Sequence, residues 1–215
     1  MWDSSHTHKH HTINQIGASH NVIYKLILKT LANRLKVFLP LIIIENYSAF
    51  TADRLVTNNV LIDYELMHYL KHKREGRDSF MATKLDMSKA FNRVEWGFIE
   101  GIMRKLGFNE KWINLVMMCV SSVSYSVIIN GDTYGNIVIS RGLRQGEPLS
   151  PYLFLLCVEG LSALLHEAAR NQHLSGISIS KGCPKITHLF FADDSLLFCK
   201  ANNEECRKLK KILEK

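Results

Sequence analysis

Two adjacent acids, Asp193 and Asp194, lie in the middle of an apolar run, FFADDSLLFC. Residues 188–192 and 195–199 each predict a short strand, so the acids are expected in the tight turn between them. Two carboxylates roughly 4 Å apart repel by about 4 kcal/mol at an effective dielectric of about 20. A turn that needed only polarity could use Asn-Gly instead. The pair therefore indicates a positive partner, and a divalent metal is the leading candidate.

A third acid, Asp86, ends the alternating segment FMATKLD, which predicts a strand over residues 80–86. If the strands are antiparallel neighbours, Asp86 lies close to Asp193 and Asp194. Hard divalent ions such as Mg²⁺ bind carboxylate oxygens together with substrate phosphates, and two such ions can activate a hydroxyl and stabilise a leaving pyrophosphate. An isolated acid in this position would more often end a strand and cap the next turn, so the prediction depends on the adjacent pair.

Composition favours a polyanionic partner and free thiols. The 215 residues are 47% hydrophobic, enough for one substantial core or two small lobes. Lys and Arg number 27 against 20 Asp and Glu, and the formal net charge of +7 favours nucleic acid as a partner. The five cysteines are scattered without a CxxC pair, which predicts free thiols in a reducing compartment inside the cell, nucleus or cytoplasm.

The start of the chain predicts little regular structure. Residues 1–20 have weak apolar periodicity and a histidine cluster, so we expect a poorly ordered tail before one folded unit over 21–215. Polar residues precede any apolar stretch, so no secretory signal is predicted. The uncharged stretch 112–131 contains several serines and changes from helical to alternating periodicity near Ser122. A helix followed by a strand is therefore expected there, and no membrane span.

The remaining pattern alternates between helix and strand. Helical periodicity predicts helices over about residues 21–39, 94–106, 110–120 and 150–169, and from 204 onward. Another helix is expected from residue 57, fraying in the basic run KHKREGR at 71–77. Pro40 is expected to stop the first helix, Thr57 to cap the second, and Ser150 with Pro151 to start the long apolar one. Two strands flank a turn containing Asn130 and Gly131. Strands and helices around one core predict an α+β architecture.

Three segments, KLDMSKAF, SRGLRQGEPLSPYLFLL and FFADDSLLF, occur in the order and spacing of motifs A, B and C of reverse transcriptases. Over about residues 21–200 the chain resembles LINE-type non-LTR retrotransposons, especially the plant kind. The resemblance implies an RNA-directed DNA polymerase, a nucleotidyltransferase that uses an RNA template, a DNA primer and deoxynucleoside triphosphates. It also implies a right-hand palm, an antiparallel sheet with packed helices, plus partial fingers. Because the chain ends soon after motif C, we expect the thumb to be absent and this copy to be truncated.

The resemblance implies a two-metal site. Asp86 and Asp193 resemble the two principal metal ligands, Asp194 the neighbouring acid, and the backbone carbonyl of Met87 a further ligand. The expected cofactor is two Mg²⁺ ions, for which Mn²⁺ can substitute. One ion would lower the pKa of the primer 3′-hydroxyl, and the other would hold the triphosphate.

The resemblance also implies nucleotide contacts. Phe91 resembles the aromatic that packs under the incoming sugar and excludes a 2′-hydroxyl, although ordinary core packing is the alternative. Arg54 resembles the fingers arginine that holds the triphosphate with its bidentate fork. Gln145 can hydrogen-bond a base or sugar edge, and Gly146 lets backbone approach the nucleotide closely. Arg144 is expected to meet backbone phosphate of the nucleic acid, although a loop arginine is by default a solvated charge.

Three positions depart from the family pattern. Asn92 and Glu147 stand where the family usually has Asp, and Asp53 replaces a usual glycine beside Arg54. Two other functions stay open: a folded remnant that binds nucleic acid without polymerising, and a metal-dependent phosphohydrolase that uses the same three acids. The RQG loop and Phe91 argue against hydrolysis, because hydrolysis needs neither a template loop nor a sugar gate.

Overall fold

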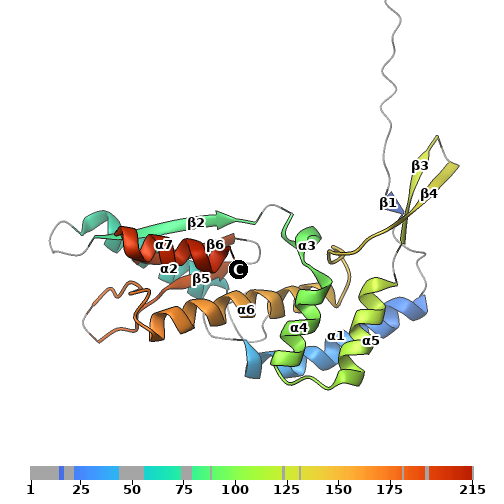
Figure 1. The fold of residues 1–215 in the computed structure, drawn as a ribbon, viewed down its shortest axis with the longest axis horizontal. Helices are drawn as coiled ribbons and strands as arrows, with labels where there is room; N and C mark the ends of the chain where they lie inside the picture. Colours follow the sequence, from blue (N-terminus) through green and yellow to red (C-terminus); the bar gives the residue numbers. More distant parts are fainter. Residues whose placement is uncertain are drawn as a thin grey trace, which may run out of the picture.

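The computed structural model describes residues 15–16, 22–43, 56–73, 79–87, 89–122, 124–130, 132–180, 182–191 and 194–214. Helices and two small antiparallel sheets make up these ranges, which is the α+β architecture that the sequence predicts (Figure 1). In chain order the elements are β1 (Gln15–Ile16), α1 (Val22–Ile42), α2 (Val56–His72), β2 (Phe80–Asp86), α3 (Ala90–Arg93), α4 (Trp96–Lys105), α5 (Glu110–Ser121), β3 (Ser124–Ile129), β4 (Asp132–Val138), α6 (Ser150–Arg170), β5 (His188–Phe191), β6 (Asp194–Lys200) and α7 (Asn203–Leu213).

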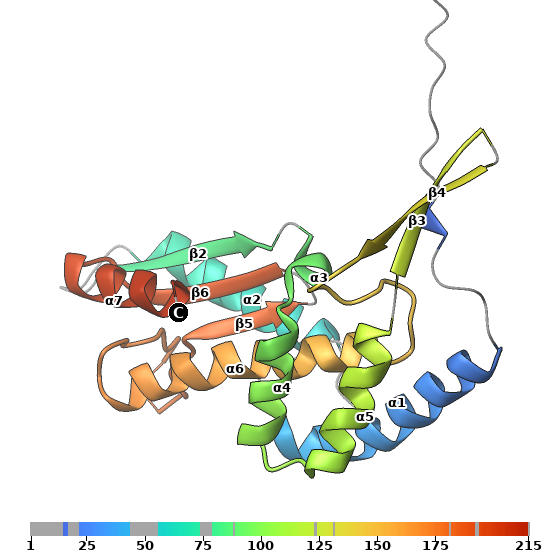
Figure 2. The ribbon, with the colours of Figure 1, turned by 45° about the vertical axis from the view of Figure 1, so that its right-hand side comes forward.

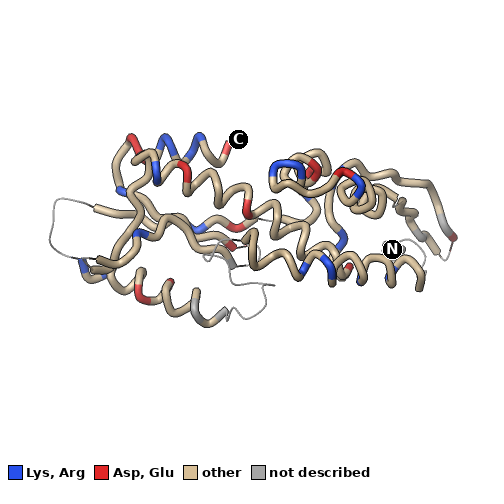
Figure 3. The backbone as a smooth tube through the Cα atoms, turned by 90° about the horizontal axis from the view of Figure 1, so that it is seen from below, with Lys and Arg blue, Asp and Glu red and all other residues tan. Residues whose placement is uncertain are grey.

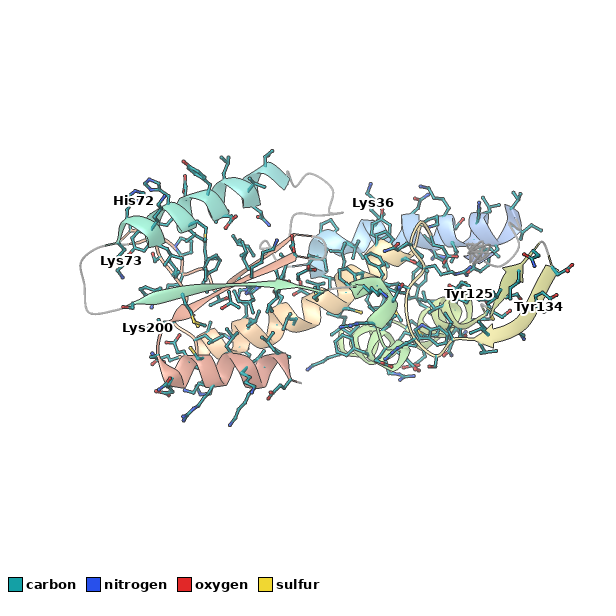
Figure 4. The ribbon with its side chains drawn as sticks, turned by 90° about the horizontal axis from the view of Figure 1, so that it is seen from above. Lys36, His72, Lys73, Tyr125, Tyr134 and Lys200 are labelled. Carbon is teal, nitrogen blue, oxygen red and sulfur yellow. The ribbon has the colours of Figure 1, made fainter. Side chains whose placement is uncertain are left out.

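The central sheet has the strand order β2-β6-β5 and is antiparallel throughout. Because side chains alternate along a strand, β6 contributes to both faces. Leu197 and Cys199 join the larger core with α6, whereas Leu196 and Phe198 pack with Leu66 of α2. Figure 4 shows the resulting layers, with α2 on one side of the sheet and α6 and α7 on the other. The sheet is therefore held rigidly between helices.

The second sheet, of order β1-β3-β4, stands away from the central one beside the start of α1 and the end of α5 (Figure 2). The turn between β3 and β4 contains Asn130 in the left-handed region, with φ 56°, as its Asn-Gly sequence predicts. The strand β1 pairs with β3 through Gln15 and Ile16. These two residues lie within 1–20, where no element was predicted, because a two-residue strand has no periodicity to detect.

The long helix α6 is the centre of the larger core. Its buried residues include Leu153, Phe154, Leu155 and Leu156, which pack with residues of α1, α4 and α5. By length and composition α6 could cross a membrane, but 56% of its most apolar window is buried inside the protein, as is usual for a core helix. The uncharged stretch 112–131 forms most of α5 followed by β3, so the predicted helix and strand are confirmed.

Three predicted helix boundaries are wrong by a few residues. Pro40 lies inside α1, because a missing N–H removes a single bond near the helix end and the N–H of Ile43 still donates to Leu39 at 2.8 Å. The helix α2 begins at Val56, so Thr57 lies inside it rather than capping it. Ser150 is the first residue of α6, with Leu149 at the cap position, so Ser150 makes no cap.

Candidate active site

The carboxylates of Asp86 and Asp194 lie at the same end of the central sheet. Asp86 is the last residue of β2, Asp194 is the first of β6, and the two are direct partners in the antiparallel register. Directly opposite residues of an antiparallel pair point to the same face. The prediction that Asp194 lies in the turn is wrong, because Asp194 is the first residue of β6, where it pairs with Phe191 of β5 and with Asp86 of β2. Both side chains are accessible, with that of Asp194 43% exposed.

Lys84 supplies positive charge beside these acids. It lies two residues before Asp86, so the strand period of two places it on the same face. Its Nζ lies 3.1 Å from Oδ2 of Asp194. Part of the repulsion between the neighbouring carboxylates is therefore offset within the chain. Lys84 is not among the residues predicted for the site, although its spacing of two residues from Asp86 is a signal that could identify it.

The predicted metal ligand Asp193 and the predicted triphosphate-binding Arg54 lie outside the described residues, as does Asp53 beside Arg54. Met87 is described, and it follows Asp86 directly at the end of β2. Within the described part of the chain, no group of three His, Cys, Asp or Glu side chains forms a metal cluster. The chemistry of the two described acids nevertheless fits a hard divalent cation, since it consists of accessible carboxylate oxygens only.

Phe91 lies in the short helix α3, five positions after Asp86. Its ring stacks on that of Phe154 in α6, with the centroids 4.7 Å apart and the planes at 16°. The Phe91 side chain is only half-buried, so the ring is anchored on the core while part of it stays accessible. This placement is compatible with both functions predicted for it, packing and contact with a sugar.

The loop between β4 and α6 is tied to the segment that follows Asp86. The N–H of Leu143 donates to the carbonyl of Phe91, and that of Gly142 donates to Val94, both at 2.7 Å. Gly142 has φ 96°, and a Cβ there would lie 3.0 Å from the carbonyl oxygen of Asn92. Only glycine fits this close approach. These contacts fix the loop next to α3, a role for Gly142 that was not predicted from the sequence.

Gln145 and Gly146 form the accessible tip of this loop. Both are exposed, and Gly146 has φ 85° with no atom within 4 Å of the position a Cβ would take. The open space around Gly146 allows another molecule to approach its backbone closely. Figure 2 shows this loop passing from the β3–β4 hairpin to the start of α6.

Arg144 has partners within the chain. Its side chain is 15% exposed, and Nη2 lies 2.9 Å from Oε1 of Glu147, the residue that departs from the family pattern. The same nitrogen donates to the hydroxyl of Tyr24 in α1 at 2.6 Å. Burial raises the pKa of the Glu147 carboxyl above its usual value, partly opposed by Arg144. Tyr24 carries no sequence signal for this contact, because 120 positions separate the two residues.

A groove of about 1320 Å³ begins at this end of the sheet. Asp86 and Met87 line its start, and it continues along α4 and α6 to Ile212 and Leu213 at the end of α7. Lysines and arginines lie on α1, α4 and α7 (Figure 3), of which α4 and α7 contribute to the groove. Most residues that line the groove are apolar, and residues of the loop between β4 and α6 are not among them, so the groove itself carries no argument for phosphate binding.

Comparison with known proteins points to one family. A family model described as "Reverse transcriptase (RNA-dependent DNA polymerase)" matches residues 11–215. The retrovirus-related Pol polyprotein from the type-1 retrotransposable element R2 of Popillia japonica is 31% identical over 178 residues, which cover 82% of this chain and 24% of that protein. A 149 kDa protein of transposon TX1 from Xenopus laevis is 28% identical over 174 residues, covering 81% and 13%.

A shorter match gives higher identity. An uncharacterized mitochondrial protein of Arabidopsis thaliana is 56% identical over 68 residues, which cover 32% of this chain and 56% of that protein. The chain thus spans about half of this relative and about a quarter or less of the two transposon proteins.

Proposed function

This chain belongs to the reverse transcriptase family, whose model matches residues 11–215, and from that membership we propose that it forms the palm and part of the fingers of an RNA-directed DNA polymerase. Its relatives among retrotransposon Pol proteins place it with the non-LTR, LINE-type elements. The observation that carries the proposal is the placement of Asp86 opposite Asp194 at one end of the central sheet.

In this proposal the acids hold two Mg²⁺ ions, or Mn²⁺ in their place. Asp86 and Asp193 are the principal ligands, and Asp194 and the carbonyl of Met87 complete the set. When bound, the two ions would lower the pKa of the primer 3′-hydroxyl and neutralise charge on the triphosphate and the leaving pyrophosphate. Lys84 would hold Asp194 in place, through the ion pair described above.

The remaining residues would bind and select the nucleotide. Arg54 would hold the triphosphate, since a guanidinium fork matches phosphate oxygens. Phe91 would lie beneath the sugar and exclude a 2′-hydroxyl, and its anchorage on Phe154 would keep its ring in place. Gln145 and Gly146 would contact the incoming nucleotide from the accessible tip of the loop.

The proposed partners are an RNA template, a DNA primer and deoxynucleoside triphosphates. The net charge of +7 supports binding to the phosphate backbones, because counterion release supplies most of such affinity. We place the protein inside the cell, in the nucleus or cytoplasm. The five free cysteines support a reducing compartment.

The test is a chimera in which this chain replaces the aligned segment of the Popillia japonica R2 Pol protein, with which it shares 31% identity over 178 residues. We expect the chimera to extend a primer on an RNA template in Mg²⁺. Asp86→Asn should abolish extension, and the matched control Asp132→Asn, at an exposed acid of β4, should not.

The same chimera separates the alternatives. A chimera that binds primer–template but never extends it would indicate a nucleic-acid-binding remnant. Strand cleavage that depends on metal and on Asp86, measured in a parallel nuclease assay without nucleotides, would indicate a phosphohydrolase. Both results would contradict the proposed polymerase.

A further inference from the structure

A chain of directed contacts links the first long helix to the loop that carries Gln145 and Gly146. Arg144 donates from Nη2 to the Tyr24 hydroxyl at 2.6 Å, and that hydroxyl donates to the carbonyl of Cys119 at 2.9 Å. The guanidinium also lies over the Tyr24 ring, 5.2 Å from its centroid. The Tyr24 hydroxyl thus accepts from the loop and donates to α5, so a single oxygen joins α1, α5 and the loop.

Arg144 lies in the loop between a fixed segment and an exposed tip, so its contact with Tyr24 affects the position of that tip. Leu143, just before Arg144, is held by the carbonyl of Phe91, and Leu149 at the other end of the loop is buried in the core. Gln145 and Gly146, just after Arg144, are exposed. The contact of the Arg144 guanidinium with Tyr24 therefore fastens the middle of the loop to α1, while the tip stays exposed. Movement of α1 against the loop would move the tip.

Glu147 makes the same site unsuitable for a phosphate. The Arg144 and Glu147 side chains are 15% and 22% exposed, and their ion pair at 2.9 Å is mostly withdrawn from solvent. If a phosphate bound Arg144 in place of Glu147, the mostly buried Glu147 carboxylate would be left unpaired beside another anion. Such a charge is strongly unfavourable in a poorly solvated site. The charge of Arg144 is therefore neutralised by Glu147 within the protein and is not available to a nucleic-acid phosphate.

We propose that Tyr24 and Arg144 are positioning residues that hold the loop carrying the Gln145–Gly146 tip in place beside α3, and that Arg144 does not bind a nucleic-acid phosphate. The proposal rests on the polymerase function proposed above, in which this tip contacts the nucleotide. It replaces the expectation from sequence that Arg144 meets backbone phosphate.

Hydrogen exchange on the intact 215-residue chain tests the link without any ligand. Tyr24→Phe keeps the ring and removes only the hydroxyl, and Arg144→Lys keeps the charge but not the fork. Both should raise exchange of the Gly142 and Leu143 amides by about tenfold, the factor for loss of a hydrogen bond with a charged group. Amides between β2 and β6 should not change, and neither should any in the control Tyr64→Phe, at an exposed ring of α2. Unchanged exchange at Gly142 and Leu143 in both variants would overturn the proposal.

Binding of a labelled RNA–DNA primer–template, measured by fluorescence anisotropy between 50 and 300 mM KCl, tests the role of the charge. A phosphate contact predicts that Arg144→Gln lowers the slope of log affinity against log salt by about 0.9, whereas Arg144→Lys keeps it. The proposal predicts an unchanged slope in both variants, and an equal loss of affinity in Arg144→Lys and Tyr24→Phe. A slope lowered by Arg144→Gln alone would overturn it. If the chain binds no primer–template, the polymerase function fails, and the exchange experiment still decides whether the link exists.

Discussion

Lys84 and Asp194 form an ion pair between neighbouring strands, with 3.1 Å from Nζ to Oδ2. The two side chains are 63% and 43% exposed, and such pairs contribute less than about 1 kcal/mol to stability. The ion pair therefore matters less for the stability of the whole protein than for the charge balance beside Asp86 and Asp194. The amine lies on the face that carries Asp86 and Asp194, where two like charges opposite one another destabilise a strand pair.

Lys84→Gln should make the protein respond more strongly to Mg²⁺. In EDTA the variant should melt slightly lower than the parent, because Asp86 and Asp194 then repel each other without a counter-charge. Mg²⁺ should raise its melting temperature more than it raises that of the parent, because the ion relieves a larger repulsion and meets no competing amine. Thermal denaturation with and without Mg²⁺ measures both effects, and Lys36→Gln, at an exposed position of α1, is the control. An equal or smaller Mg²⁺ response in Lys84→Gln would contradict this role.

Asp86→Asn or Asp193→Asn in the R2 chimera should abolish Mg²⁺-dependent extension and leave primer–template binding largely intact. The acids hold ions used in chemistry, whereas Lys and Arg contacts with phosphates dominate affinity. Extension and anisotropy assays on the same preparations separate the two effects. Near-normal extension by either variant would rule out the two-metal assignment.

Phe91→Ala in the chimera should raise incorporation of ribonucleotides relative to deoxyribonucleotides, because space opens beneath the sugar. If Phe91 only packs on Phe154, Phe91→Ala should lose stability with unchanged selectivity. Truncating a fully buried phenylalanine costs about 3–5 kcal/mol, which is the upper limit for the half-buried Phe91. Competition between the two nucleotide types, together with the melting temperature, decides between these functions. Phe154→Ala removes the same ring stack but keeps the Phe91 ring, so it should lower stability and relax selectivity less than Phe91→Ala does.

Elements with strong local periodicity were predictable from the sequence. The strand over residues 80–86 is confirmed in full, and its alternating pattern places Asp86 at the end of β2. The Asn130–Gly131 turn between two strands is confirmed as well, because its residues favour the left-handed conformation. Motif order and spacing then brought acids from two distant strands into one predicted site.

Features that depend on contacts between distant segments were not predictable. Asp194 belongs to β6 because it pairs with Phe191 across the hairpin and with Asp86 of β2. The second pairing joins distant segments, and no pattern within 188–199 contains that register. The contact between Tyr24 and Arg144 spans 120 positions, and both residues have ordinary local explanations. Gly142 could be assigned to a loop, but its close approach to Asn92 depends on how that loop docks.

His188 should make stability depend on pH. It is fully buried in β5, where its ring nitrogens lie 2.9 Å from the hydroxyls of Ser162 and Thr187. Burial, with a smaller contribution from nearby His166, lowers the pKa of His188 to about 3. The folded protein therefore keeps the ring neutral while the unfolded chain binds a proton below about pH 6.5. The contribution of neutral His188 to the unfolding free energy is fully present above that pH. It is lost as the pH falls toward 3, by up to about 1.4 kcal/mol per pH unit.

Denaturant unfolding at pH 7.5, 6 and 5 measures this dependence of the unfolding free energy. His188→Gln keeps a hydrogen-bonding side chain that does not titrate, so it should lower stability at pH 7.5 and flatten the decline below pH 6.5. His173→Gln, at an exposed histidine after α6, should leave the decline as it is. A decline as steep in His188→Gln as in the parent would show that other groups cause it.

Glu205 should matter far more to stability than its neighbour Glu204. Glu205 is buried at the start of α7, where its carboxylate accepts from the backbone N–H and the hydroxyl of Ser175 and from the N–H of Lys200. These bonds outweigh burial and lower the pKa of Glu205 below its usual value. They join the end of β6, the strand that begins with Asp194, to the segment after α6. Glu205→Ala would leave the donors unpaired, at a cost of about 2–4 kcal/mol.

Glu204 provides the matched control, because it is exposed and pairs with Lys208 on the same helix. Glu204→Ala should change the unfolding free energy by no more than the error of a denaturant titration at pH 7. The pH supplies a second check on Glu205. A carboxyl whose pKa is lowered in the folded protein contributes stability above its pKa in the unfolded chain, about 4.3, and loses that contribution as the pH falls further. The stabilities of Glu205→Ala and Glu204→Ala should therefore converge in acid. Equal stability of both variants at pH 7 would show that the Glu205 bonds do not hold β6 in place.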